Sequence, residues 1–224
     1  MFQIKICGIT TTEDGEQAAR AGADAIGLNF YPGSPRFVSA SQAREIGEVV
    51  GEDVVKVGVF VNADVDTIQD LAEQIGLDII QLHGDEPPRT LRSLSDHRVV
   101  KAFRCRDAGF QPVLDFVTAC HELGQLPDAV LLDAHAPGKY GGTGLCIDWP
   151  AVRAARPAIK NIPIVLAGGL TAENVDRAIA EARPTAVDAA GGVESRPGRK
   201  DPDKIRRFVA NAQAAFRRVN AQPY

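Results

Sequence analysis

The chain has 224 residues, 45% of them hydrophobic and 24% charged, and its formal net charge at pH 7 is −4. These values are ordinary for a soluble globular protein, and because no basic run stands out they argue against a nucleic-acid partner. Charged residues interrupt the first 20 positions, and no apolar stretch approaches the roughly 20 residues that cross a bilayer, so we expect a cytoplasmic protein without a membrane partner.

Strand-like and helix-like segments alternate along the whole chain. Short apolar runs predict strands, and longer stretches with apolar residues three and four positions apart predict helices. The predicted strands are 3–7, 25–30, 54–61, 79–82, 99–103, 129–133, 164–167 and 186–189. The predicted helices are 13–21, 41–50, 65–75, 88–94, 113–123, 149–155, 172–182 and 202–218.

This alternation predicts parallel strands joined by helical crossovers. Most strand-like runs are apolar at consecutive positions, as in a sheet that is covered on both faces. Eight units without an intervening linker predict one α/β domain over residues 1–224, a (β/α)8 TIM barrel. An open doubly wound sheet is the alternative, and the absence of a GxGxxG motif after the first strand favours the closed barrel.

The first strand ends in Cys7, directly before Gly8. The carboxyl ends of barrel strands form the mouth in which such enzymes keep their catalytic groups. Lys5 lies two positions earlier and so on the same face, and we hypothesise that its cation favours the Cys7 thiolate. A buried ion pair between Lys5 and another residue is the alternative. Since no CxxC pair is present, the cysteines predict reduced thiols rather than a disulfide framework.

Two further segments carry polar side chains at predicted strand ends. After the second strand, Arg36 stands between a proline and a phenylalanine, and a guanidinium restricted in this way suits bidentate binding of a carboxylate. A surface arginine after a proline-rich turn is the alternative. The fourth strand ends with Gln81 and His83, which the period of two places on one side, facing the mouth. A purely structural histidine is the alternative there.

The sixth strand ends in Asp133, so a thiol and a carboxyl on two strand ends suggest an acid–base pair. Three later loops are rich in glycine, at 137–144, 167–170 and 190–194. The last two follow the seventh and eighth strands, where barrel enzymes frequently bind phosphate through backbone N–H groups. Tight turns that merely require glycine are the alternative. The predicted phosphate-binding residues are Gly168, Gly169, Gly191 and Gly192.

Taken in order, these motifs resemble the phosphoribosylanthranilate isomerase family of tryptophan biosynthesis. The matching segments are KICGIT at 5–10, GLNF at 27–30, SPRFVS at 34–39, VGVFVN at 57–62, QLHG at 81–84, LLD at 131–133, GGTG at 141–144 with DW at 148–149, and AGGL at 167–170. They span nearly the whole chain. The resemblance implies a (β/α)8 enzyme that converts N-(5-phosphoribosyl)anthranilate to 1-(2-carboxyphenylamino)-1-deoxyribulose 5-phosphate by an Amadori rearrangement.

The resemblance also implies roles for individual residues. Cys7 matches the general base of the family, Asp133 the general acid, and Arg36 the arginine that binds the anthranilate moiety. The last two glycine-rich loops match the phosphate site. The further substrate-binding residues that we predict are Gln81, His83 and Asp188. The reaction needs no metal or redox cofactor, its partner is a small phosphosugar, and both a monomer and a homodimer remain open.

One segment departs from the family pattern. The family usually has DVSSGVE after the eighth strand, whereas this chain has DAAGGVE at 188–194. Ala190 and Gly191 replace both serines, so two hydroxyl donors to the phosphate are lost. Because backbone N–H donors can remain, we expect weaker or rearranged phosphate contacts.

The implied mechanism makes opposite demands on the two reacting groups. A thiol with the reference pKa of about 8.5 is only about 3% thiolate at pH 7, so Cys7 must be helped to ionise. A carboxyl with the reference pKa of about 3.9 is about 0.1% protonated, so the pKa of Asp133 must rise. Burial, the anionic groups of the substrate, and closure of the 137–144 loop are the expected causes.

Three rival functions remain. The related isomerase of histidine biosynthesis uses paired aspartates, but the first strand here ends in Cys7. Ribulose phosphate epimerases need a histidine–carboxylate metal site that the sequence does not supply. A non-catalytic phosphate-ligand sensor has no need of a matched acid and base.

Overall fold

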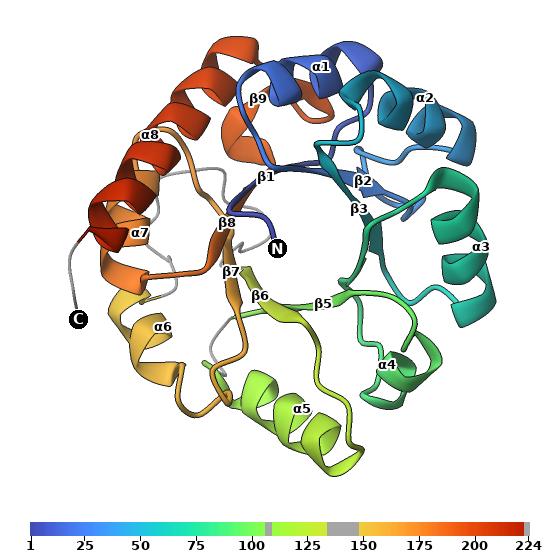
Figure 1. Cartoon of the computed structure of the whole chain (residues 1–224), viewed down its shortest axis with the longest axis vertical. Coiled ribbons are helices and arrows are strands. Elements are labelled where there is room, and N and C mark those ends of the chain that lie inside the picture. The colour runs from blue at the N-terminus through green and yellow to red at the C-terminus, as the bar shows by residue number, and fades with distance from the viewer. Residues whose placement is uncertain (106–108, 134–147, 222–224) are drawn as a thin grey trace.

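The structure is a computed structural model that describes residues 1–105, 109–133 and 148–221. In this part of the chain, eight parallel strands close into a barrel in chain order, and the last strand pairs with the first. Figure 1 shows the helices as a ring outside these strands. The predicted (β/α)8 barrel is therefore confirmed, and the doubly wound alternative is wrong. The predicted glycine-rich loop at 137–144 lies outside the described residues.

The elements follow the predicted alternation, with one addition. The barrel strands are β1 (Ile4–Cys7), β2 (Ala25–Asn29), β3 (Val55–Phe60), β4 (Ile79–Leu82), β5 (Val99–Arg104), β6 (Ala129–Asp133), β7 (Ile164–Ala167) and β8 (Ala186–Ala189). The helices are α1 (Thr12–Arg20), α2 (Ala40–Val50), α3 (Val65–Ile75), α4 (Arg89–Ser93), α5 (Gln111–Glu122), α6 (Trp149–Ala155), α7 (Val175–Ala182) and α8 (Pro202–Asn220). The addition is a short 3-10 helix, η1 (Gly191–Val193), with a hairpin of β9 (Glu194–Arg196) and β10 (Arg199–Lys200).

Side-chain caps fix where several helices begin. The Thr11 side chain accepts the N–H of Asp14 at the start of α1, and Ser39 and Gln42 form a capping box at the start of α2. Asp64 caps α3 in the same way. Each cap satisfies backbone donors that a helix start leaves without intrahelical partners. Helices α1 and α3 begin soon after the strands that precede them, whereas a longer loop, residues 30–39, separates β2 from α2.

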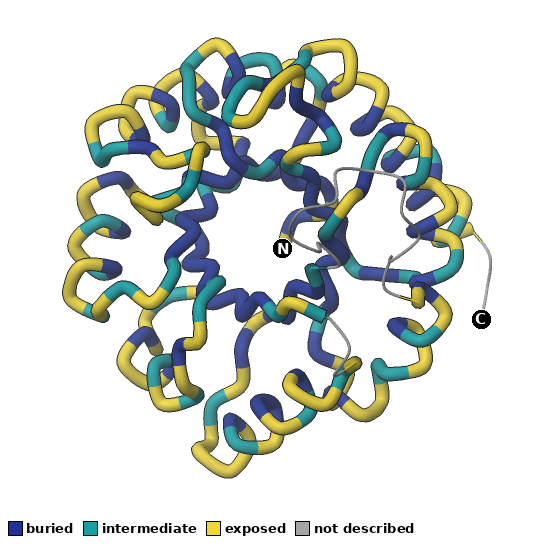
Figure 2. The backbone as a smooth tube through the Cα atoms, turned by 180° about the vertical axis from the view of Figure 1, so that it is seen from behind, coloured by how far each residue is buried: buried dark blue, intermediate teal, exposed yellow. Residues whose placement is uncertain are grey.

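The core has two parts, one inside the barrel and one between the strands and the helices. The inner part is an apolar cluster that includes Phe2, Val57, Leu131 and Val165. The outer part contains the strand residues that face the helices, and Figure 2 shows the ring of buried strands inside the largely exposed helices. Among the described residues, no helix is both long and apolar enough to span a membrane. The buried polar side chains inside the barrel include Lys5, and they form the site described below.

The predicted bounds of four strands (β4, β6, β7, β8) and two helices (α3, α6) match the structure, and most of the others shift by one or two residues. Helix α7 begins three residues late, at Val175, because the Thr171 N–H donates to Asn174 Oδ1 and shapes a turn before it. The β9–β10 hairpin was not predicted from the sequence. Its strands are only three and two residues long, too short for a period-two pattern to be recognised.

Candidate active site

Strand register brings the polar side chains of the mouth together. Lys5 of β1 lies opposite Asp188 of β8, and Cys7 of β1 lies opposite Gly27 of β2. Lys5 is completely buried, and its Nζ lies 2.9 Å from Asp188 Oδ2. Asp188 Oδ1 is also buried and has no hydrogen-bond partner among the described residues. One acceptor inside the mouth is therefore unsatisfied.

The space for the Cys7 side chain comes from Gly27. A Cβ at residue 27 would lie 2.7 Å from Cys7 Sγ and 3.1 Å from Lys5 Cε. The first distance is shorter than real Cβ contacts, so any larger residue would displace the thiol or the strand. Glycine is therefore required here by the position of the thiol over β2 and not by a turn.

The surroundings of Cys7 act on its ionisation in opposite directions. Burial raises the pKa of the thiol above its ordinary value, and the charge of Asp188 adds to this effect. The cations of Lys5 and Lys200 lower the pKa, although burial outweighs them. Burial also disfavours the Lys5 ammonium, but Asp188 and Cys7 together raise the pKa of Lys5. The buried ion pair, which was the alternative for Lys5, is thus observed with Asp188, and the effect of Lys5 on the ionisation of Cys7 stays a prediction.

The other described cysteines lack cationic neighbours of this kind. Burial raises the pKa of Cys105 to about 11, and the charge of Asp133 contributes to that rise. Burial alone raises the pKa of Cys120 to about 11. Among the cysteines that the structure describes, Cys7 has the environment that best supports a thiolate.

The hairpin that the sequence did not predict supplies two more charges beside Cys7. Lys200 Nζ donates to the Cys7 carbonyl oxygen at 2.6 Å and to Glu194 Oε1 at 3.0 Å. Burial lowers the pKa of Lys200, against the attraction of Glu194. The signal that could have revealed these residues is Pro197-Gly198, a typical turn pair between two short polar segments. Gly198 adopts a φ of 78°.

Arg36 is held by the same hairpin. Its Nε and Nη2 each donate to one oxygen of Glu194 at 2.7 Å, in a bidentate geometry. Burial acts to raise the pKa of Glu194, but hydrogen bonds from Arg36 and Lys200 lower it overall. The predicted bidentate use of this guanidinium is thus observed with a protein carboxylate, and 24% of the Arg36 side chain remains exposed.

On the opposite part of the barrel, the side chains of Gln81 and His83 connect Lys5 to Asp133 at the end of β6. Lys5 Nζ donates to Gln81 Oε1 at 3.1 Å, and Gln81 Nε2 lies 3.0 Å from His83 Nδ1. His83 Nε2 lies 3.6 Å from Asp133 Oδ2. Gln81 and His83 share one face, as predicted, and Asp133 reaches the mouth with 20% of its side chain exposed. Gln81, by contrast, is almost completely buried.

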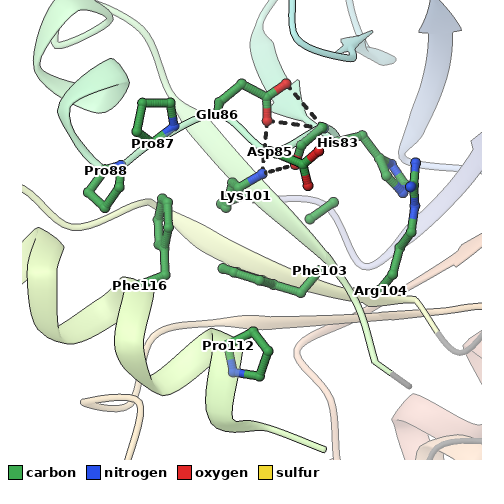
Figure 3. A pocket seen from close by; sticks show the side chains of 12 residues that line it. His83, Asp85, Glu86, Pro87, Pro88, Lys101, Phe103, Arg104, Pro112 and Phe116 are labelled. Atoms are coloured by element: carbon green, nitrogen blue, oxygen red, sulfur yellow. Dashed lines mark hydrogen bonds and ion pairs between the residues drawn. The ribbon is translucent and has the colours of Figure 1, made fainter. Parts of the chain in front are cut away.

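A cavity of about 350 Å³ adjoins His83 between the β4–α4 loop, β5 and α5. Figure 3 shows prolines and the rings of Phe103 and Phe116 around it, with Lys101 directed at Glu86. Lys101 Nζ lies 2.8 Å from Glu86 Oε2 and donates to the Gly84 carbonyl oxygen at 2.6 Å. Glu86 in turn accepts the backbone N–H groups of Asn62 and Gly84. This buried pair fixes the segment that follows His83.

The two predicted phosphate loops touch each other. A Cβ at Gly192 would lie 1.9 Å from the Leu170 carbonyl oxygen, so the loop after β8 contacts the loop after β7. Gly168 and Gly169 adopt φ values of 86° and 67°, which glycine tolerates without strain. Among the described residues, neither of these two backbone N–H groups finds an acceptor. The phosphate site predicted at these loops stays a prediction, and the two N–H groups are the donors available for it.

Comparison with known proteins points to one family. The family described as "N-(5'phosphoribosyl)anthranilate (PRA) isomerase" matches residues 4–211. A protein named N-(5'-phosphoribosyl)anthranilate isomerase from Geobacter metallireducens is 43% identical over 215 residues, which cover 96% of this chain and 100% of that protein.

Solved structures agree with this result. The crystal structure of phosphoribosyl anthranilate isomerase from Thermotoga maritima superimposes with a TM-score of 0.84 at 38% identity, covering 96% of this chain and 100% of the other. A structure of such an isomerase in complex with reduced 1-(o-carboxyphenylamino)-1-deoxyribulose 5-phosphate gives a TM-score of 0.81 at 36% identity, with the same coverage.

Proposed function

The chain belongs to the family of N-(5'-phosphoribosyl)anthranilate isomerases, and we propose that Cys7 and Asp133 perform its acid–base chemistry. The protein is an isomerase of tryptophan biosynthesis with a TIM-barrel fold. The observation that carries the proposal is the position of the two side chains. They end β1 and β6, and Cys7 has two lysines beside it.

The proposed reaction is an aldose–ketose rearrangement with a balanced proton count. Asp133 gives its proton to the ribose ring oxygen as the bond from C1 to that oxygen breaks, which leaves a protonated Schiff base between C1 and the anthranilate nitrogen. The Cys7 thiolate then takes the proton from C2, and the C2–H electron pair neutralises the iminium nitrogen. The resulting enolamine tautomerises to the ketone. One acid and one base are sufficient.

The charges around Cys7 support its role as a base. The cations there are Lys5, Lys200 and Arg36, and the carboxylates are Asp188 and Glu194. Of these described cations, Lys5 and Lys200 act to lower the pKa of Cys7. Both ammonium groups attract a thiolate, and this attraction offsets part of the cost of burying the anion.

Most of the other predicted site residues can be assigned a group of the substrate. Asp188 Oδ1, buried and unsatisfied among the described residues, suits a sugar hydroxyl. The exposed part of Arg36 suits the anthranilate carboxylate. The N–H groups of Gly168 and Gly169 suit the phosphate, with Gly191 and Gly192 on the adjoining loop. His83 lines the mouth between the cavity and Asp133.

The test of the proposal follows the loss of anthranilate-type fluorescence after addition of freshly made N-(5-phosphoribosyl)anthranilate. We expect wild type to turn over, and Cys7→Ala and Asp133→Asn each to lower kcat/KM by about 10²- to 10⁴-fold. Binding of the reduced product analogue should change little, because neither variant alters the charge or shape of the phosphate loops. Near-normal turnover in either variant would remove the role assigned to that residue. A wild type that binds the analogue without turnover would favour the sensor.

A further inference from the structure

Gln81 of β4 was predicted to bind substrate, yet its surroundings suit another task. It is 1% exposed, and both ends of its amide are engaged within the protein. The Lys5 ammonium can only donate, so the Gln81 atom that faces it at 3.1 Å must be the oxygen. Lys5 is itself held by Asp188 at 2.9 Å, which leaves this end of the amide little freedom to reverse.

The orientation of the amide determines the tautomer of the neighbouring histidine. With its oxygen toward Lys5, Gln81 presents an N–H to His83 Nδ1 at 3.0 Å. His83 Nδ1 must then be the accepting nitrogen, and the proton of a neutral imidazole must reside on Nε2. Nε2 is the atom that lies 3.6 Å from Asp133 Oδ2. Contacts of this kind are often long before substrate binds and shorten in the complex.

Taken together, the contacts lead us to propose that Gln81 is a positioning residue that holds His83 as the neutral Nε2–H tautomer, with this N–H directed at Asp133. The inference rests on the proposed role of Asp133 as general acid. His83 thereby orients the Asp133 carboxyl toward the substrate. It does not supply the proton, because a neutral imidazole is a very weak acid.

The charges around His83 act in both directions. Asp133 on β6 favours the imidazolium, as does Asp85 in the loop after β4, which lines the same cavity. Arg104 on β5, lining that cavity, and Lys5 behind Gln81 oppose it. The Lys101 ammonium of β5 is paired with Glu86.

The hydrogen-bond geometry decides between these charges. An imidazolium would place an Nδ1–H against the N–H of the Gln81 amide, and reversing the amide would place its N–H groups against the Lys5 ammonium. Either arrangement leaves two donors facing each other in a buried site.

The experiment measures the imidazole ¹⁵N chemical shifts of His83 in uniformly labelled protein. The chain has four histidines, so His83→Asn identifies the signals. We expect wild type to show the neutral Nε2–H tautomer of His83 at pH 8. In Gln81→Glu, a carboxylate can accept from Nδ1–H. The Nδ1–H tautomer should then appear, and kcat should fall by up to about 100-fold while the KM changes little.

Gln74→Glu is the matched control, since Gln74 is exposed on α3; it should leave both the spectrum and the activity unchanged. If Gln81→Glu does not fold, Gln81→Met should give a mixture of the two His83 tautomers. A wild-type His83 in the Nδ1–H tautomer at pH 8, or a Gln81→Glu spectrum like that of wild type, would overturn the inference. The tautomer is read without turnover, so a failure of Asp133→Asn to lose activity would contradict the proposed function separately.

Discussion

Two buried lysine–carboxylate pairs lie on opposite parts of the barrel, and they differ in how completely their hydrogen bonds are satisfied. In the Lys101–Glu86 pair, both carboxylate oxygens accept hydrogen bonds, and the ammonium also donates to a backbone carbonyl. In the Lys5–Asp188 pair, one oxygen of Asp188 has no partner among the described residues. A carboxylate whose oxygens all have partners can only stabilise the fold. A carboxylate with an oxygen that lacks a partner can still accept a hydrogen bond from a substrate.

The side chains around the two pairs also differ, since those near Lys101 are structural and those near Lys5 belong to the candidate site. Lys101 Nζ lies 5.6 Å from the centroid of the Phe103 ring, and its hydrogen bond to the Gly84 carbonyl oxygen fixes the segment that follows His83. Lys5 acts on the Cys7 thiol and on the amide of Gln81. Two buried pairs of the same charge types thus have different roles: Lys101–Glu86 stabilises the fold, and Lys5–Asp188 belongs to the proposed active site.

The largest effects are expected from removing each lysine. Both removals should destabilise the fold, but only the removal of Lys5 should change the pKa of Cys7. Lys101→Met and Lys5→Met should each lower the free energy of unfolding by roughly 3–5 kcal/mol, because each leaves a buried carboxylate without its cation. Lys5→Met should in addition raise the pKa of Cys7. Urea unfolding and a thiol titration, corrected with Cys7→Ala for the other cysteines, measure the two quantities.

Lys101→Met should leave the pKa of Cys7 where it is in wild type. The double variant Lys101→Met with Glu86→Leu should recover part of the lost stability, since no charge is then left unpaired, although the N–H groups of Asn62 and Gly84 lose their acceptor. An unchanged Cys7 pKa in Lys5→Met would remove Lys5 from the chemistry.

A smaller effect is expected from Gly27→Ala on the Lys5 side. The added methyl would meet Cys7 Sγ at 2.7 Å and must displace it. A misplacement on the order of 1 Å can cost about 100-fold in kcat, so we expect a loss of up to that size with little change in KM. Gly47→Ala on α2 is the control, because its nearest neighbour is the flexible end of Lys56 at 3.3 Å. Equal kcat values for the two variants would show that the thiol does not need this space.

The pH dependence of stability should sharpen the contrast. Burial acts to raise the pKa of Glu86, but Lys101 and backbone N–H groups lower it overall. A carboxyl whose pKa is lowered by folding contributes stability above its unfolded pKa of about 4.3, and this is lost as the pH falls through the folded value. Wild type should therefore lose more stability on acidification than the Lys101→Met, Glu86→Leu double variant. Parallel curves from pH 7 to 3 would contradict this assignment.

The smallest effect is expected where the chain departs from its family. A Cβ at Gly191 would lie 3.6 Å from Arg36 Nη2, an ordinary contact, so Gly191→Ser fits without distortion. With Ala190→Ser, it would restore two hydroxyl donors near the phosphate loops, each worth about 1 kcal/mol. We expect KM to fall by up to about 30-fold with little change in kcat. A KM that does not fall would indicate that backbone N–H groups already saturate the phosphate.

The features that could be predicted from the sequence are those that depend on neighbouring residues. The alternation of strands and helices, and the placement of Cys7 and Asp133 at strand ends, depend on residues near each other in the chain. The partner of Lys5 is 183 residues away, and that of Arg36 is 158 residues away. Only the closed register of β1 with β8 makes Asp188 the partner of Lys5. Arg36 contacts Glu194 at a hairpin whose strands are too short for a period-two pattern, so that only its turn pair marks it in the sequence.

The most direct test of the paired roles of Cys7 and Asp133 is the isotope effect on single turnover with substrate deuterated at C2 of the ribose. If Cys7 removes the C2 proton, Cys7→Ser should slow turnover and give a larger isotope effect, since proton abstraction becomes limiting. Asp133→Asn should slow turnover with an isotope effect near one, because ring opening then limits the rate. An isotope effect and a rate in Cys7→Ser equal to those of wild type would contradict the account.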